Sequence, residues 1–191
     1  MLLREQMQRL VERDRLTDVA TRDFFFEKLM NFPDAYGVSL MVDIDHFKLV
    51  NDTHGHLVGD TVIHAVAQAM ISQVRKRDIV CRFGGEEFVV FLHRATREEG
   101  WNTAERIRMA TEACVTQAND EPIRVTVSVG GTLKKQLDTI EDAIKRADEC
   151  LYQAKKLGRN RTIVDWGSDL SAGVTPDGFD QYAPSGPGQA A

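Results

Sequence analysis

The most constraining feature of the sequence is a pair of short apolar runs joined by two glycines and two acids. Residues 78–81 (DIVC) precede the segment RFGGEEF at 82–88, and residues 89–92 (VVFL) follow it. This pattern predicts a β-hairpin in which the glycines supply the positive φ angles of the turn. Glycine has no Cβ, so a phosphate or a base could approach this backbone closely. Taken alone, the segment is equally consistent with a surface hairpin whose acids aid solubility.

The length and composition favour one domain with an ample core. The chain has 191 residues, 42% of them hydrophobic, and a formal net charge of −5. This balance does not suggest a duplex nucleic acid as a partner. Cys81, Cys114 and Cys150 form no CxxC pair, which argues against a disulfide scaffold or a zinc module. The sequence has no apolar run of about 18 residues and no signal-peptide pattern, so we expect a cytoplasmic chain without membrane insertion.

The chain divides into three predicted parts. Residues 1–13 are expected to be the end of a linker or signalling helix, because their apolar residues recur every three or four positions. A helix packed on its own domain is the alternative, and the repeat is too short to decide. Residues 14–166 form the predicted domain. Residues 167–191, rich in Gly, Pro, Ser and Ala, are expected to be a disordered tail.

Apolar periodicity predicts further helices and strands in the domain. The helices are expected at 22–32, 60–74, 96–114 and 139–157, and the strands outside the hairpin at 38–42, 124–130 and 159–165. Asp60 is expected to cap the N-terminus of its helix, and Gly158 to follow the end of the last helix. Gly130 and Gly131 are expected to begin a turn. The strand at 38–42 is mostly apolar, which predicts a central strand covered on both faces.

Acids follow this central strand directly. Asp43 and Asp45 would be costly in a core unless they were paired or metal-bound. Ligand sites in sheet proteins also lie beyond strand ends. If the strand lies beside the hairpin, Asp43 would converge with Glu86 or Glu87. Such oxygen ligands suit a Mg²⁺ ion held jointly with the phosphates of a substrate.

Cations and polar side chains extend this predicted site. Lys48, Lys155 and Arg159 could hold a triphosphate, although the last two could simply complement the dipole at a helix C-terminus. Asn51 and Asp60 could read guanine, because a carboxylate accepts hydrogen bonds from both its N1–H and its exocyclic amine. The alternative is that Asp60 only caps its helix and that Asn51 only supports a loop.

Together these motifs resemble the GGDEF-domain diguanylate cyclases, in the GGEEF variant of the signature. The resemblance covers residues 14–165 and rests on RFGGEEF (82–88), DIDHFK (43–48), NDT (51–53), GH (55–56), GD (59–60), RAD (146–148), YQAK (152–155) and GRN (158–160). It implies an α/β (α+β) fold of the nucleotide-cyclase and polymerase-palm type. Such a fold has a central mixed sheet of about five strands surrounded by helices, with a β-hairpin that carries the GGEEF turn.

The resemblance also implies roles for individual residues. The metal ligands would be Asp43, the Ile44 carbonyl and Glu86. The catalytic residues would be Glu86, Glu87 and Lys48, with the proton acceptor left open between either glutamate and a metal-bound group. The substrate-binding residues would be Phe47, Lys48, Asn51, His56, Asp60, Gly85, Lys155 and Arg159. The cofactor would be Mg²⁺ or Mn²⁺, at about two ions per GTP.

The implied reaction condenses two GTP molecules into cyclic di-GMP and releases two pyrophosphates. The 3′-oxygen of one GTP attacks the α-phosphorus of the other. The product has two equivalent phosphodiester links, so two domains are expected to face each other as a homodimer. We expect an upstream sensory domain in a longer parent chain and no nucleic-acid partner. The alternative function is a catalytically silent receptor for cyclic di-GMP or GTP.

An RxxD pattern at Arg75 and Asp78 lies just before the hairpin, where the family binds its product as an inhibitor. Arg106 lies where the family supplies a second arginine. Arginine can bind guanine at O6 and N7, so we predict feedback inhibition by cyclic di-GMP. The chain departs from the family after its Leu-Thr pair. Asp18 and two residues near it replace the usual Gly, Leu and Asn, which bears on how the N-terminal segment docks.

Overall fold

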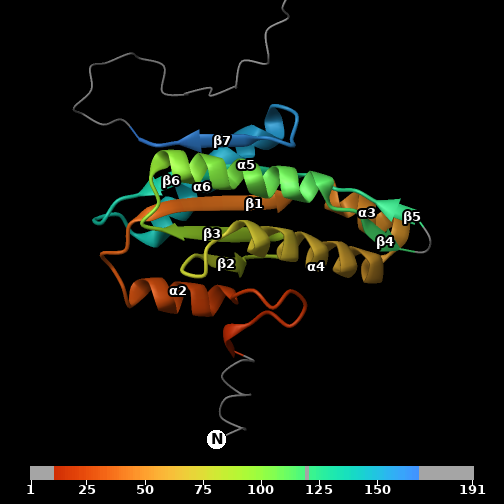
Figure 1. The fold of residues 1–191 in the computed structure, drawn as a ribbon, viewed down its shortest axis with the longest axis horizontal. Coiled ribbons are helices and arrows are strands. Elements are labelled where there is room, and N and C mark those ends of the chain that lie inside the picture. Colours follow the sequence, from red (N-terminus) through yellow and green to blue (C-terminus); the bar gives the residue numbers. More distant parts are fainter. Residues whose placement is uncertain (1–10, 119–120, 168–191) are drawn as a thin grey trace, which may run out of the picture.

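The computed structural model describes residues 11–118 and 121–167, and its centre is a five-stranded sheet with the order β2-β3-β1-β6-β7 (Figure 1). The strands are β1 (Gly37–Ile44), β2 (Ile79–Arg82), β3 (Glu87–His93), β6 (Val127–Lys134) and β7 (Thr162–Asp165). β7 runs parallel to β6, and the other neighbours are antiparallel. The mixed five-stranded sheet and the hairpin that carries the GGEE turn are therefore confirmed.

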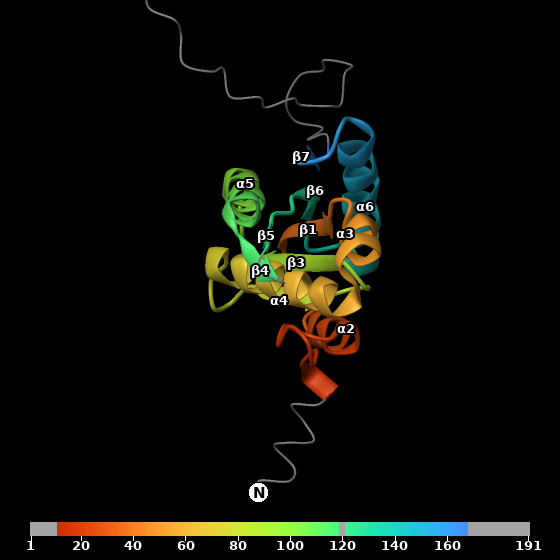
Figure 2. The same cartoon turned by 90° about the vertical axis from the view of Figure 1, so that its right-hand side faces the viewer.

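Helices cover both faces of this sheet (Figure 2). One face carries α4 (His56–Gln73) and α5 (Arg97–Ala113), and the other carries α2 (Arg22–Met30) and α6 (Ile140–Lys156). A short helix α3 (Phe47–His54) follows β1, and a small hairpin of β4 (Thr116–Ala118) and β5 (Glu121–Ile123) follows α5. Among the described residues, no helix has the length and apolar character to cross a membrane.

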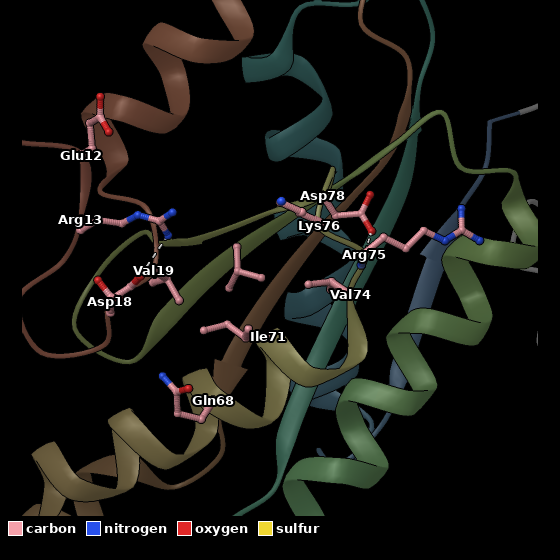
Figure 3. A pocket seen from close by; sticks show the side chains of 11 residues that line it. Glu12, Arg13, Asp18, Val19, Gln68, Ile71, Val74, Arg75, Lys76 and Asp78 are labelled. Atoms are coloured by element: carbon pink, nitrogen blue, oxygen red, sulfur yellow. Dashed lines mark hydrogen bonds between the residues drawn. The ribbon is translucent and has the colours of Figure 1, made fainter. Parts of the chain in front are cut away.

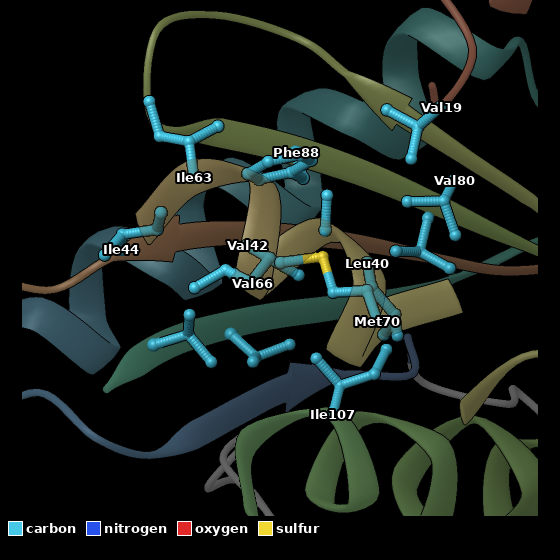
Figure 4. Packing of buried hydrophobic residues seen from close by; sticks show 14 of the residues in the cluster. Val19, Leu40, Val42, Ile44, Ile63, Val66, Met70, Val80, Phe88 and Ile107 are labelled. Carbon is cyan, nitrogen blue, oxygen red and sulfur yellow. The ribbon is translucent and has the colours of Figure 1, made fainter. Parts of the chain in front are cut away.

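Every residue of β1 is buried, as a central strand covered on both faces requires. Its even-numbered side chains belong to the larger apolar cluster, between the sheet and α4 and α5, whereas Met41 belongs to the cluster beneath α2 and α6. Figure 4 shows the larger cluster, with Leu40, Val42, Val66, Met70, Phe88 and Ile107. The two clusters fix the register of β1, and with it the position of the acids at its end.

Two predictions about glycines are wrong. Gly84 and Gly85 are not among the glycines with positive φ, because the hairpin closes through a longer turn in which the N–H groups of Phe83 and Gly84 both donate to the Glu87 carbonyl. Gly130 lies inside β6 and begins no turn. A Cβ on Gly130 would lie 2.0 Å from the Ala147 carbonyl oxygen, so this glycine allows α6 to pack directly on the strand.

The predicted N-cap at Asp60 is also wrong. α4 begins at His56, directly after Gly55. The φ of 85° at Gly55 interrupts the helical conformation between α3 and α4, so Asp60 lies inside α4. The sequence pattern predicts no helix at the position of α3. The prediction for Gly158 is confirmed, because this residue has a φ of 115° directly after the Leu157 cap of α6.

Several predicted boundaries shift by a few residues. α2 ends at Met30, and Phe32 beyond it is 63% exposed. β6 and β7 each begin about three residues later than predicted. Asp18, where the family has glycine, adopts a φ of 57°, a conformation that aspartate tolerates better than most residues. The predicted helix at 1–13 and the tail at 167–191 lie almost entirely outside the described residues.

Candidate active site

The acids and one predicted cation meet where β1 ends. Asp43 is the cross-strand partner of Glu87 on β3, so the two side chains project from the same face of the sheet. Lys155, in the last turn of α6, places Nζ 2.8 Å from Oδ2 of Asp43. The Ile44 N–H donates to the Glu86 carbonyl at 3.3 Å, which holds the turn against the end of β1. The predicted convergence of strand end, hairpin and helix end is therefore present.

The pKa of Asp43 reflects its burial and its charged neighbours. Burial raises the pKa of its carboxyl to about 6, against the lowering effect of Lys155, and the charges of Glu86 and Glu87 raise it further. Both glutamates thus lie within electrostatic reach of Asp43. Among the described residues, however, no group of three or more His, Cys, Asp or Glu side chains is arranged to hold a metal ion. The donor set fits a divalent cation that takes its remaining oxygen ligands from elsewhere, such as from phosphates.

The GGEE turn is open to solvent on one side and is held in place by the side chain of Arg82. Gly85 is exposed, and a Cβ there would meet nothing within 4 Å. Arg82 donates two hydrogen bonds to the Gly85 carbonyl, at 2.9 and 3.1 Å, and forms an ion pair with Asp14 at 3.2 Å. Burial alone would raise the pKa of Asp14, but hydrogen bonds from Thr17 and the charge of Arg82 hold it below its usual value. The N-terminal segment is thereby tied to the turn.

A second polar group lies where α3 meets α4. The Asn51 amide lies against Gly59, where a Cβ would come within 1.9 Å of Oδ1. That oxygen is buried without a hydrogen-bond partner in the described part of the chain. Asp60, the next residue, is exposed, and so is His56 one turn earlier. Phe47 is buried beneath this group, so the structure brings the predicted guanine-reading residues to one place.

The three predicted phosphate-binding cations differ in their surroundings. Lys155 is held by Asp43, as described above. Arg159 is half-buried, and within residues 11–118 and 121–167 its guanidinium has no hydrogen-bond or ion-pair partner. Lys48 pairs with Asp52 at 2.6 Å on the outer face of α3, and its side chain is 85% exposed. Lys48 therefore does not contact the carboxylates of the site.

Two residues close to the site were not predicted to contribute to it. Arg82 is the first residue of the RFGGEEF segment, and that position in the motif was the only available signal. Asp45 was noted as an acid after a buried strand but was given no role. It is 4% exposed and accepts hydrogen bonds from two side chains and one backbone N–H group.

Comparison with known proteins decides the family. The family model described as "Diguanylate cyclase, GGDEF domain" matches residues 11–161. The chain belongs to the GGDEF domain family. Diguanylate cyclase DosC of Escherichia coli K12 is 38% identical over 180 residues, which cover 88% of this chain and 39% of that protein. Diguanylate cyclase A of Treponema denticola is 35% identical over 169 residues, which cover 83% and 46%.

Solved structures of GGDEF domains have the same fold. Diguanylate cyclase SiaD of Pseudomonas aeruginosa, solved in complex with its activator SiaC, has a TM-score of 0.78 at 33% identity, over 85% of this chain and 65% of that one. The coiled coil and GGDEF domain of DgcB from Caulobacter crescentus, solved with c-di-GMP, has a TM-score of 0.77 at 29% identity, over 85% and 90%. The chain spans less than half the length of the curated relatives named above.

The predicted inhibitory residues of this GGDEF domain lie together, away from the carboxylates. Arg75, Asp78 and Arg106 line one small cavity between α5 and the start of the hairpin. Arg75 pairs with Glu99 at 2.6 Å, and Arg106 donates to the Gln73 carbonyl at 3.0 Å. The Asp78 carboxylate accepts from the backbone N–H groups of Arg75 and, at 3.0 Å, of His93. Asp78 therefore shapes the turn that presents Arg75.

A larger cavity of about 560 Å³ opens beside the same turn (Figure 3). Its walls are the segment around Arg13 and Asp18, the end of α4 with Ile71 and Val74, and the residues before β2. Arg75 and Asp78 line both cavities. A ligand bound at this turn could therefore extend to either side of it.

Proposed function

We propose that this GGDEF domain is a diguanylate cyclase that condenses two GTP molecules into cyclic di-GMP and releases two pyrophosphates. The observation that carries the proposal is the ion pair of 2.8 Å between Lys155 and Asp43, with Glu87 opposite Asp43 in the strand register. A cation for phosphates and acids for a divalent ion thus lie side by side. The relatives named diguanylate cyclases give independent support.

We infer that Asp43, the Ile44 carbonyl and Glu86 hold Mg²⁺ or Mn²⁺ together with the substrate, at about two ions per GTP. The raised pKa of Asp43 supports this, because burial and, to a smaller extent, the charges of Glu86 and Glu87 disfavour its ionised form, and a bound cation would relieve that cost. A bound divalent ion would lower the pKa of the attacking 3′-hydroxyl and neutralise charge on the leaving pyrophosphate. Glu86 in place of the aspartate of a GGDEF signature keeps a carboxylate at this position.

The residues of the chain bind and orient the nucleotide in this proposal. Lys155, Arg159 and Lys48 bind the triphosphate, beside the backbone at Phe47. The exposed backbone of Gly85 leaves room for the ribose and phosphates to approach. Glu87, or else Glu86, accepts the proton of the 3′-hydroxyl, unless a metal-bound group does so.

Guanine is read where α3 meets α4. Asp60 accepts hydrogen bonds from N1–H and the exocyclic amine, with His56 close by. Asn51 contacts the same base. Its buried side-chain oxygen then gains a hydrogen-bond partner, either from the base directly or after a rotation of the amide group that exchanges its oxygen and nitrogen. Adenine has no such pair of donors on that edge, so ATP would leave these acceptors unpaired.

Two further features belong to the proposal. Two domains face each other about a two-fold axis during catalysis, because each holds one GTP and the product has two equivalent links. Cyclic di-GMP inhibits by binding at Arg75, Asp78 and Arg106, which share one cavity. We also propose a cytoplasmic location, the domain limits 14–166 and control by a sensory domain of a longer parent chain.

Substitution of a single acid tests the function. Glu86→Gln keeps the size of the side chain but removes its charge, so it should abolish cyclic di-GMP formation from GTP and Mg²⁺ while the protein stays folded. Glu149→Gln, an exposed glutamate on α6, is the matched control and should leave the rate unchanged. Full activity of Glu86→Gln would refute the metal assignment. A wild-type protein that binds cyclic di-GMP but never forms it would be a receptor.

A further inference from the structure

Asp45 lies one residue beyond β1 and joins three segments of the chain. Its carboxylate accepts from the hydroxyls of Thr126 and Ser128, both at 2.7 Å, and from the backbone N–H of Asn160 at 3.0 Å. It is 4% exposed. A buried carboxylate is tolerated when hydrogen bonds compensate it in this way. Asp45 therefore fixes the chain segment that follows α6 against the end of β1.

Asn160 is held from its other side by α5. Arg108 donates from Nη1 to the Asn160 Oδ1 at 2.9 Å, and the Asn160 Nδ2 donates to Glu112 at 2.9 Å. Arg108 is itself held by Glu105, which also accepts from the hydroxyl of Thr162 on β7. The backbone of Asn160 is thus held by Asp45 at the end of β1, and its side chain is held by Arg108 and Glu112 of α5.

The turn that Asn160 ends has a strained backbone. Gly158, Arg159 and Asn160 have φ values of 115°, 63° and 44° in succession. Glycine adopts such angles freely and asparagine tolerates them, but an arginine does so only where the surroundings impose the conformation. The Arg159 N–H also donates to the Ala154 carbonyl at 3.0 Å, which seats the turn on the end of α6.

We propose that Asp45 and Asn160 are positioning residues that hold Arg159 ready for the triphosphate of GTP. This rests on the proposed function, in which Arg159 binds phosphate. A guanidinium binds phosphate oxygens well only in a defined orientation. If the backbone of Arg159 is fixed before the ligand arrives, less conformational entropy is lost on binding. The half-buried guanidinium of Arg159 has no partner among the described residues, so it is available to a ligand.

The test is a double-mutant cycle with 3′-deoxy-GTP and Mg²⁺ as the probe, because this nucleotide lacks the attacking hydroxyl and its binding is measured without turnover. Asp45→Ala should raise the Kd about tenfold, equal to roughly 1.4 kcal/mol. In the Arg159→Ala background the same change should raise Kd by less than about twofold, because the residue that Asp45 positions is gone. Asp34→Ala, which removes an exposed aspartate in the loop before β1, is the control and should leave the Kd unchanged.

A second variant covers the case in which Asp45→Ala does not fold. Asn160→Gly removes the side-chain contacts to α5 while glycine still accepts the backbone angles, and it should weaken binding only when Arg159 is present. Equal losses with and without Arg159 would overturn the proposal, because they would show a general structural effect. So would an unchanged Kd in both variants.

The same cycle separates this inference from the proposed function. Cyclic di-GMP formation by the wild type, together with additive losses in the cycle, would refute the positioning role alone. Failure of the wild type to form cyclic di-GMP, together with a non-additive cycle, would refute the cyclase and leave the positioning role standing.

Discussion

Arg82 connects the start of the domain to the GGEE turn, so Arg82→Ala should both destabilise the domain and loosen the turn. Its guanidinium reaches Asp14 at 3.2 and 3.4 Å and the Gly85 carbonyl at 2.9 and 3.1 Å. The side chains of Arg82 and Asp14 are 19% and 24% exposed, so solvent screens the ion pair only in part. Truncation would leave a partly buried carboxylate with one partner fewer.

The size of the effect follows from these contacts. An ion pair of this length and exposure contributes about 0.5–1 kcal/mol to the free energy of unfolding. Hydrogen bonds from a charged donor add about 1.5 kcal/mol, a value at the low end of their range because the Gly85 carbonyl is exposed. The expected loss is therefore about 2 kcal/mol. With a urea m-value of about 2 kcal/mol/M for a domain of this size, the unfolding midpoint should fall by about 1 M.

Urea unfolding of Arg82→Ala, Asp14→Ala and the double variant measures the total loss of stability and the part of it that comes from the ion pair. The coupling between the two sites should be about 0.5–1 kcal/mol. Arg15→Ala is the matched control, because Arg15 is exposed and, in the described part of the chain, its side chain has no hydrogen bond or ion pair. A loss at Arg82 no larger than at Arg15, with no coupling to Asp14, would refute the reasoning. Hydrogen exchange at residues 83–86 should also quicken in Arg82→Ala.

Three other predictions concern packing, protonation and inhibition. Gly130→Ala would place its Cβ 2.0 Å from the Ala147 carbonyl oxygen. Thermal unfolding should therefore show a loss of about 3 kcal/mol or more in the free energy of unfolding. A wild-type melting temperature would contradict the packing of α6 on β6. Burial raises the pKa of Asp43 from 3.8 to about 6, so its contribution to stability is complete below pH 3.8 and is lost as the pH rises through 6. In EDTA, the stability of Asp43→Asn relative to the wild type should therefore increase between pH 4 and pH 7, and a pH-independent difference would contradict the raised pKa. Glu99→Gln keeps a side-chain oxygen for the capping box of α5 but weakens the pair between Glu99 and Arg75. Arg75 should then bind the product more readily, so a lower concentration of cyclic di-GMP should give half-maximal inhibition. An unchanged inhibitory concentration would contradict inhibition at this site.

The elements with strong local signals could be predicted from the sequence. The apolar run of β1, the helical repeat of α6 and the Gly158 stop depend on neighbouring residues and are found where predicted. Gly130 was misread because a glycine pair in sequence does not distinguish a turn from a strand on which a helix packs closely. The start of α4 was misread because Gly55, and not an acidic cap, separates it from α3.

The same distinction applies to the site. Asp43, Glu87 and Lys155 were predicted to converge, since acids after a buried strand and cations at the end of a helix are visible in the sequence. Arg82 contacts a residue 68 positions away, and Asp45 contacts one 115 positions away. No local pattern encodes such pairs, because they depend on how distant segments dock. The contributions of Arg82 and Asp45 could therefore be found only in the folded structure.

The most direct test of the proposed function is the product that the wild-type protein forms from GTP. The protein would be incubated with GTP and Mg²⁺ over a range of protein concentrations, and the nucleotides separated by chromatography with mass detection. The cyclase predicts cyclic di-GMP with two pyrophosphates for each product, and at low protein concentration a rate that rises more steeply than the concentration itself, because two domains must meet. GTP that remains intact at concentrations that force dimers would contradict it.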